Sequence, residues 1–248
     1  MLKVRIIPIL TFNGFGLVKT KQFSNPRMVG NAVQAARVYN SRGVDELVFL
    51  DINATAQKRK LNLKLVKDVI KECYMPVAIG GGITTIEDIN SLLRIGADKV
   101  VIKTMALKDR DFIKEAVHFF GSQCITIAVD AIKKPEGYFI YHNGGDFILM
   151  NEFINQMNEC DVGEFIINSV DNDGMMNGFD TELVKTLMQL TKKPIIAVGG
   201  GGQMDHYSKL FVETNISAVG SASIFHFTQF TPLDIKSELL KYNINVRL

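Results

Sequence analysis

Short apolar runs alternate along the chain with segments in which apolar residues recur every three or four positions. The clearest run is ITIAVD at residues 125–130, which is apolar, partly β-branched and ends in a carboxylate. A run of this kind, bounded by turn signals, is typical of a parallel strand covered on both faces. Asp130 then lies at the C-terminal end of a strand, where parallel α/β folds keep their chemistry. An Asp that only caps the following turn is an equally good interpretation of this residue alone.

The strand and helix patterns alternate along the whole chain. Predicted strands cover residues 4–10, 46–51, 77–79, 99–102, 125–130, 164–168, 195–198 and 218–220. Predicted helices cover residues 27–42, 61–73, 86–95, 107–120, 149–160, 181–190, 204–213 and 233–242. Residues 12–26 are predicted as a long mobile loop, and residues 133–145 as a glycine-marked excursion compatible with a hairpin. Eight such units in about 250 residues predict one domain, residues 1–248, folded as a (β/α)8 TIM barrel.

An internal repeat divides the predicted barrel into halves of about residues 1–120 and 121–248. PVAIGGG, followed by VVIKTMAL, recurs about 118 residues later as PIIAVGGG followed by AVGSASIF. A glycine run after one strand and a small or hydroxyl residue opening the next helix bring backbone N–H groups to a phosphate. We therefore predict two phosphate sites that face each other across the barrel mouth. The first comprises Gly81, Gly82 and Thr104, and the second comprises Gly201, Gly202, Ala222 and Ser223.

Composition narrows the function classes. The net charge is +2 with acids and bases interspersed, which gives no electrostatic case for nucleic acid or a membrane surface. No apolar run approaches the ~18 residues of a membrane helix, and the first residues lack a signal-peptide pattern. Cys73, Cys124 and Cys160 lie in apolar contexts without metal-ligand spacing, as expected of reduced thiols in a cytoplasmic protein. The histidines share no ligand spacing either, so we expect no metal and no cofactor.

Several motifs carry a resemblance to a known family. In chain order they are VDELVFLDI, IGGGI, GADKV, ITIAVDA, VDNDGMMNGFDTELV, VGGGG and SIFHF. The sequence resembles the cyclase subunit of imidazole glycerol phosphate synthase, the HisF family, over nearly its whole length. The resemblance implies a heterodimer with a separate HisH-type glutaminase docked at the N-terminal face of the barrel. Ammonia from that subunit would travel along the barrel axis to a bisphosphorylated substrate at the other end.

The resemblance also assigns roles to charged residues. Arg5, Glu46, Lys99 and Glu164 match the ring that gates the ammonia path. Four such charges at strand starts are equally well explained as a salt-bridged barrel floor, since unpaired charges there would be costly. At the other face, Lys19 matches a substrate-contacting lysine in the first loop. The loop with Asp173 and Gly174 matches one that touches the substrate's glycerol phosphate end. For Asp51 and Asp171, which end strands at this face, substrate contact and turn capping are equally good interpretations.

Two positions depart from the family pattern. The family uses two carboxylates as acid and base; one is present as Asp130, but the other position holds Thr11. The internal repeat gives the same alignment, because RIIPILT matches CITIAVD. A hydroxyl cannot replace a carboxylate as a proton shuttle, and losing a general acid or base typically costs ~10²–10⁴-fold in rate. Lys103 replaces a family Asn beside the first phosphate site, where a cation suits a diphosphate; a solvated rim lysine is an equally good interpretation.

These departures, with LTFNGFGLVKTKQF in the first loop, resemble a paralogous branch of the family. Members of that branch work with their own glutaminase in the modification of surface-polysaccharide sugars such as those of lipopolysaccharide. The resemblance implies that an acetamido group on an activated sugar is converted to an acetamidino group, with Asp130 as base. The alternatives are imidazole glycerol phosphate synthesis in the histidine pathway and a non-catalytic activator of the glutaminase.

Overall fold

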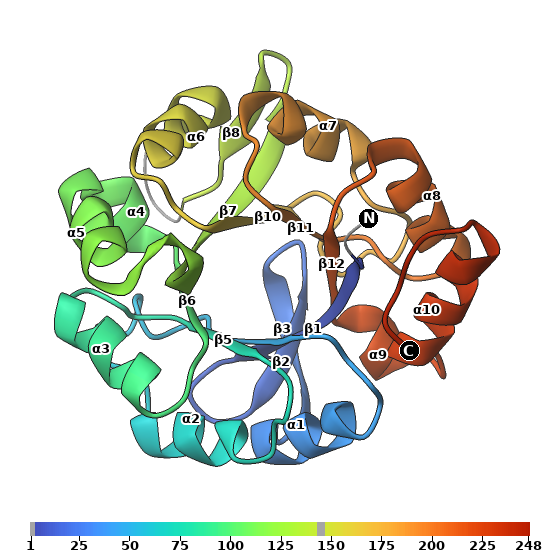
Figure 1. Cartoon of the computed structure of the whole chain (residues 1–248), viewed down its shortest axis with the longest axis horizontal. Coiled ribbons are helices and arrows are strands. Elements are labelled where there is room, and N and C mark those ends of the chain that lie inside the picture. The colour runs from blue at the N-terminus through green and yellow to red at the C-terminus, as the bar shows by residue number, and fades with distance from the viewer. Residues whose placement is uncertain (1–2, 143–146) are drawn as a thin grey trace.

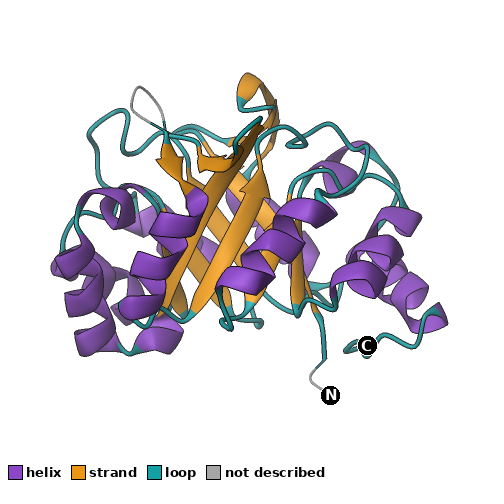
Figure 2. Ribbon diagram, turned by 90° about the horizontal axis from the view of Figure 1, so that it is seen from above, coloured by secondary structure: helices purple, strands orange, loops and turns teal. Residues whose placement is uncertain are grey.

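A closed barrel of eight parallel strands, surrounded by helices, forms the centre of the molecule (Figure 1, Figure 2). The computed structural model describes residues 3–142 and 147–248. The barrel strands are β1 (Arg5–Phe12), β4 (Leu47–Asp51), β5 (Val77–Gly80), β6 (Lys99–Ile102), β7 (Ile125–Lys134), β10 (Glu164–Ser169), β11 (Ile195–Val198) and β12 (Ala218–Ser221). The barrel closes because β10 pairs with both β11 and β7. The predicted (β/α)8 barrel is confirmed.

The helices pack outside the barrel and bury one face each. They are α1 (Ala32–Asn40), α2 (Leu63–Ile70), α3 (Ile86–Arg94), α4 (Thr104–Lys108), α5 (Arg110–Phe120), α6 (Met150–Glu159), α7 (Thr181–Leu190), α8 (Met204–Thr214), α9 (Ser223–Phe227) and α10 (Pro232–Lys241), with a 3₁₀ turn, η1, at Ser122–Cys124. Side-chain caps fix several helix starts, as in the capping box between Thr85 and Asp88 at α3. In the described part of the chain, none of the helices is both long and apolar enough to cross a membrane.

Two stretches differ from the sequence predictions. The helix predicted from residue 27 starts at Ala32, because the Asn31 side chain accepts hydrogen bonds from the N–H groups of Val33 and Gln34 and caps it there. The helix predicted at 107–120 is two helices, α4 and α5. Asp109 has extended backbone angles between them, and its side chain caps α5 by accepting from the Phe112 N–H.

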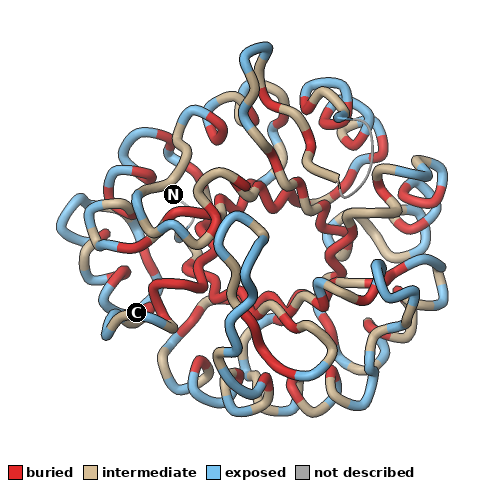
Figure 3. The backbone as a smooth tube through the Cα atoms, turned by 180° about the vertical axis from the view of Figure 1, so that it is seen from behind, coloured by how far each residue is buried: buried red, intermediate tan, exposed pale blue. Residues whose placement is uncertain are grey.

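The segment predicted as a mobile loop, residues 12–26, is largely strand. β2 (Leu17–Lys21) pairs antiparallel with the end of β1, and β3 (Ser24–Gly30) pairs with β2. We call β2 and β3 the first flap; Figure 3 shows this exposed hairpin crossing in front of the barrel opening. The strand pattern was hidden because most residues of β3 are exposed, so no apolar alternation marks it.

A second flap occupies the equivalent place in the other half of the barrel. β7 continues into an antiparallel pairing with β8 (Gly137–Ile140), which pairs in turn with β9 (Ile148–Leu149). The predicted hairpin is thus confirmed where the structure describes it, while residues 143–145 lie outside the described residues. The internal repeat therefore includes a flap as well as a pair of strand ends in each half.

Candidate functional site

Alternate residues of the barrel strands point into the barrel and form three levels. Arg5, Glu46, Lys99 and Glu164 form a charged level at the strand starts. Two positions further along, the middle level is an apolar cluster that includes Ile7, Val48, Val101, Ile166, Ile196 and Ala218. Two to four positions beyond the middle level, the inward-facing residues lie at the mouth of the barrel; they are Thr11, Lys103, Asp130 and Asn168. The period of two in a strand therefore connects the charged level to the mouth along one axis.

The mouth holds a cavity of about 580 Å³, lined by strand ends from both halves of the barrel and by both flaps. This is the volume of a small-molecule site. Among the predicted site residues, those that line it are Thr11, Lys19, Asp51, Gly81, Gly82, Lys103, Thr104, Asp130, Asp173, Gly174, Gly201, Ala222 and Ser223. The predicted substrate face is therefore one continuous cavity.

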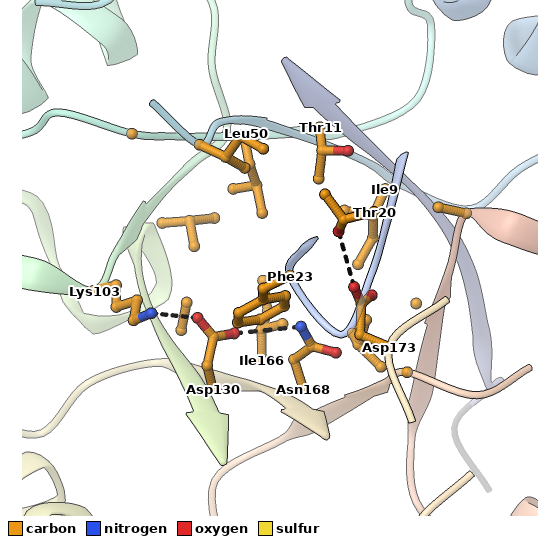
Figure 4. A pocket seen from close by; sticks show the side chains of 18 of the residues that line it. Ile9, Thr11, Thr20, Phe23, Leu50, Lys103, Asp130, Ile166, Asn168 and Asp173 are labelled. Carbon is orange, nitrogen blue, oxygen red and sulfur yellow. Dashed lines mark hydrogen bonds and ion pairs between the residues drawn. The ribbon is translucent and has the colours of Figure 1, made fainter. Parts of the chain in front are cut away.

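Asp130 is the centre of a polar cluster in this cavity (Figure 4). Its carboxylate forms an ion pair with the Lys103 ammonium and accepts a hydrogen bond from Asn168 Nδ2 at 3.3 Å. Asn168 Oδ1 is buried and has no hydrogen-bond partner among the described residues. The cluster thus contains a carboxylate and, beside it, a buried amide oxygen whose capacity to accept a hydrogen bond is not used by the described residues.

Thr11 lies across the cavity from Asp130 (Figure 4). Its hydroxyl donates to the carbonyl oxygen of Val18 in the first flap, so it ties the strand end to the flap. The hydroxyl is therefore already used, and it does not ionise near neutral pH. The mouth contains an acid on β7, at Asp130, and no acid at the matching position of β1.

Lys19 and Asp173 join the first flap to the opposite side of the mouth. Lys19 Nζ lies 2.9 Å from Asp173 Oδ1, and Thr20 Oγ1 donates to the other carboxylate oxygen at 3.0 Å. The Gln22 N–H donates to the Asp173 carbonyl at 2.8 Å. At Gly174 a Cβ would collide with the Thr20 carbonyl, so only glycine permits this approach. In this structure Lys19 and Asp173 therefore hold the flap over the cavity.

Asp51 is buried and fully bonded. It lies against the Arg59 guanidinium, with Arg59 Nη1 at 2.5 Å, and it accepts hydrogen bonds from the N–H groups of Asn53 and Ala54. These contacts are those of a residue that orders the turn after β4. Asp171 does not line the cavity; its side chain accepts from the Lys133 N–H, which ties the loop after β10 to the last residues of β7. The capping interpretation fits both contact sets.

The two glycine loops differ in detail. In the first, Gly81 and Gly82 have φ of 112° and 65° and both line the cavity. In the second, Gly199, Gly200 and Gly201 line it, whereas the Gly202 N–H donates to His206 Nδ1 at 3.3 Å and Gly202 does not. Ser223 Oγ, beside the second loop, is buried without a hydrogen-bond partner in the part of the chain that is described. That hydroxyl is available for an anion.

At the other end of the axis, the four charged residues form a closed ring of ion pairs. Arg5 Nη1 lies 2.7 Å from Glu46, Lys99 Nζ lies 3.0 Å from Glu46 and 2.9 Å from Glu164, and Arg5 also pairs with Glu164. Burial would raise the pKa of Glu164, but hydrogen bonding and the charges of Arg5 and Lys99 outweigh it and hold that pKa below its ordinary value. A gate and a paired floor both require this arrangement.

Several cavity residues were not singled out from the sequence. Asn168 follows Glu164 and Ile166 at the strand period, which is the signal that could have found it. Phe23 and Tyr141 come from the two flaps, with ring centroids 5.6 Å apart. Lys108 and His142 also line the cavity, and no sequence motif marks them. Among the described residues, no group of three or more His, Cys, Asp or Glu side chains is arranged to hold a metal ion.

Comparisons with known proteins agree with this geometry. Residues 5–231 match the family described as "Histidine biosynthesis protein". The chain is 42% identical to imidazole glycerol phosphate synthase subunit HisF of Staphylococcus saprophyticus, over the full length of both proteins. It is 38% identical to a Vibrio vulnificus protein provisionally named imidazole glycerol phosphate synthase subunit hisF2, covering all of this chain and 92% of that protein.

Proposed function

We propose a function from the premise that this chain belongs to the HisF family of histidine biosynthesis proteins. The chain is the synthase subunit of a glutamine amidotransferase pair: it takes ammonia released by a glutaminase and adds it to a phosphate-bearing substrate in the mouth cavity. More specifically, it adds ammonia to an activated amide carbon without closing an imidazole ring. The single observation that carries this conclusion is the unequal pair of strand ends, with the Asp130 carboxylate on one side and a flap-bound Thr11 hydroxyl on the other.

The barrel axis supports ammonia delivery. Above the ion-pair ring, the interior is lined by small or aliphatic residues such as Ala78, Ala128 and Val101 up to the cavity floor. The free-energy cost of desolvation in such surroundings is small for neutral ammonia and large for the charged ammonium ion. In this proposal the paired ring faces the glutaminase, and the apolar section leads ammonia toward Asp130.

The N-terminal face supports a partner subunit. Tyr74 lies between α2 and β5 and is 92% exposed, and Phe119 lies at the end of α5 and is 62% exposed. Loops that enter parallel strands all lie at the face where the strands begin, so both aromatics flank the ring end. Exposed aromatic side chains of this kind are enriched in protein interfaces. We assign this face to a HisH-type glutaminase, which would place the heterodimer in the cytoplasm where glutamine is available.

The chemistry at the mouth needs one base. Ammonia attacks the carbon of the activated amide, Asp130 takes a proton from the attacking nitrogen, and the oxygen leaves with its activating group. A phosphate that enters beside Gly82 and Thr104 would compete for Lys103 and so release the Asp130 carboxylate. The Asn168 side-chain amide donates to the Asp130 carboxylate and so orients it in the cavity. The product is an amidine, and we propose an acetamido group on an activated surface-polysaccharide sugar as the acceptor.

A second candidate is the cyclase of imidazole glycerol phosphate synthase itself. The names of the two relatives favour it directly, and neither name mentions sugars or polysaccharides. Ring closure in this family uses the acid that Thr11 replaces. The two candidates therefore differ at one position, which makes them separable by experiment.

The test measures turnover of the bisphosphorylated precursor of imidazole glycerol phosphate with excess ammonium at alkaline pH, where free ammonia replaces the glutaminase. Native protein is compared with Thr11→Asp, which restores the acid, and with Thr11→Asn, whose side chain has the size of aspartate but carries no acid. We expect Thr11→Asp to be at least ~10²-fold faster than the other two, because a general acid or base contributes ~10²–10⁴-fold. Native turnover at the rate of a working enzyme and equal to that of Thr11→Asp would instead establish the cyclase, and no turnover by any of the three proteins would exclude it.

A companion assay addresses the acceptor. The pair is reconstituted with a HisH-type glutaminase and glutamine labelled with ¹⁵N in its side-chain amide, and the label is followed into an acetamidino product. Transfer of label supports amidine synthesis. Stimulated glutamine hydrolysis without labelled product from any acceptor would leave only the role of a glutaminase activator.

A further inference from the structure

The two anion sites of the mouth have similar backbones and different side chains. α4 and α9 each follow a barrel strand, each has five residues, and their N-cap residues have nearly the same backbone angles: φ −122° and ψ −68° at Lys103, φ −136° and ψ −60° at Ala222. The backbones therefore correspond residue by residue. In that register Lys103 corresponds to Ala222, Thr104 to Ser223, and Lys108 to Phe227.

The first site is the cationic one. Lys103 and Lys108 both line the cavity, as does His142 at the end of β8. The Tyr141 N–H donates to the Asp130 carbonyl at 2.7 Å, so His142 is the residue that follows this tether to β7. The proximity of the three groups also appears in the pKa of His142, which is lowered first by burial and then by the charges of Lys103 and Lys108.

The positive charge of the two lysines at this site exceeds the negative charge of Asp130. Lys103 is paired with Asp130, whereas Lys108 has no ion-pair partner among the residues that the structure describes. Lys108 thus leaves a net positive charge at the cavity wall that it shares with His142. At the second site the matching positions supply a methyl group, a hydroxyl and a phenyl ring, and Lys19 nearby is paired with Asp173. A monophosphate is adequately held by a hydroxyl and backbone N–H groups, but a diphosphate needs additional positive charge.

We propose that Lys108 and His142 form an anion subsite beside the first glycine loop, so that the first half of the barrel binds a diphosphate ester and the second half a single phosphate or a neutral group. This subsite deepens the proposed function. It rests on that function in one respect, that the mouth cavity is the substrate site. The substrate class it names is a molecule with a diphosphate next to the group that receives ammonia. Lys103 holds the inner phosphoryl group, and Lys108 with His142 holds the outer one.

The experiment is calorimetric titration of the full chain with inorganic pyrophosphate and, separately, inorganic phosphate at fixed ionic strength. The variants are Lys108→Gln and His142→Gln. Lys108→Arg keeps the charge, and Lys67→Gln is the matched control, since it removes an exposed helix lysine that does not line the cavity. We expect Lys108→Gln to weaken pyrophosphate binding about tenfold or more and His142→Gln about threefold or more, because hydrogen bonds to charged groups are strong. Phosphate binding should change by less than about threefold, and Lys108→Arg should restore pyrophosphate binding.

Two results would overturn the subsite. One is pyrophosphate affinity unchanged in Lys108→Gln, and the other is an equal loss in Lys67→Gln, which would reflect net charge alone. The titration uses no turnover and no partner. Failure of amidine synthesis together with Lys108-dependent pyrophosphate binding would therefore reject the proposed function and leave the subsite, and the reverse pattern would reject only the subsite.

Discussion

The two halves of the barrel share a backbone plan and divide the chemistry between them. Each half has a strand that extends into an antiparallel flap, β1 with β2 and β3 in one and β7 with β8 and β9 in the other. At the matching strand ends stand Thr11 and Asp130, the first bonded to its flap and the second facing the cavity. Beside the glycine loops stand Lys103 and Ala222. The second half supplies the carboxylate of the mouth, and the first half supplies the lysine that pairs with it.

The difference teaches that symmetry of the fold sets positions and not roles. At the other end of the axis, the halves do agree in one respect, since Glu46 and Glu164 occupy matching places in the ion-pair ring. The two cations of that ring, Arg5 and Lys99, both come from the first half. The ring is therefore symmetric in its carboxylates and asymmetric in its cations, as the mouth is asymmetric in its carboxylate and its lysines.

The largest expected effect comes from the strand ends. Asp130→Asn should lower ammonia incorporation by ~10²–10⁴-fold, because it removes the proposed general base and Thr11, the matching residue, cannot replace it. Thr11→Val should lower it by about tenfold at most, since it removes one hydrogen bond to the flap. The measurement is steady-state incorporation of ammonia into whichever acceptor the companion assay identifies. Similar losses in the two variants would contradict the division of roles.

An intermediate effect is expected where the halves agree. Glu164→Gln leaves Arg5 and Lys99 with Glu46 alone. We expect the free energy of unfolding to fall by about 2 kcal/mol, which is less than for a fully buried pair because Arg5 and Lys99 are partly exposed. Urea unfolding measures the change. Glu46→Gln is the matched variant from the other half, and its loss should be similar.

Glu164→Gln should also change how the stability of the protein depends on pH in the acid range. The pKa of Glu164 is lowered in the folded state, so its stabilisation is fully present above the ordinary glutamic acid value of 4.5 and is lost as the pH falls through the lowered value. Wild type and Glu164→Gln should therefore differ most near neutrality and converge as acid is added. Parallel stability curves throughout the acid range would show that this carboxylate does not titrate as its contacts require.

The smallest effect concerns the two phosphate sites. Ser223 Oγ has no partner among the described residues, so Ser223→Ala should weaken binding of inorganic phosphate at the second site about three- to tenfold. Thr104→Val, the matching change in the first half, should weaken phosphate binding less, because Lys103 remains. Titration calorimetry compares the two variants. A larger loss in Thr104→Val would mean that Lys103 does not dominate phosphate binding at the first site.

The barrel could be predicted from the sequence because its strands carry a strong signal. Each is an apolar run buried on both faces, and the internal repeat by itself aligns Thr11 with Asp130. The first flap carried no such signal, since most residues of β3 are exposed and the run includes Pro26. Pairing with β2, which depends on the end of β1, decides its conformation, and that partner is not visible in the local pattern.

The site was predictable to the same extent. Asp130, Lys103 and the glycine loops follow barrel strands, so their common location follows from the topology. Lys108 and His142 could not be found in this way. Lys108 lies on a five-residue helix and His142 just after β8, and only the fold brings both to the same cavity.

Asp130 supports the second flap with an atom that its chemistry does not use. Its carboxylate meets Lys103, while its carbonyl oxygen accepts the Tyr141 N–H that anchors the flap. Every residue has that carbonyl, so the tether is inherited by any substitution at this position. An evolving lineage could therefore exchange the reactive group at residue 130 in a single step and keep the surrounding chamber intact, which makes this strand end a natural point for the family to acquire new reactions.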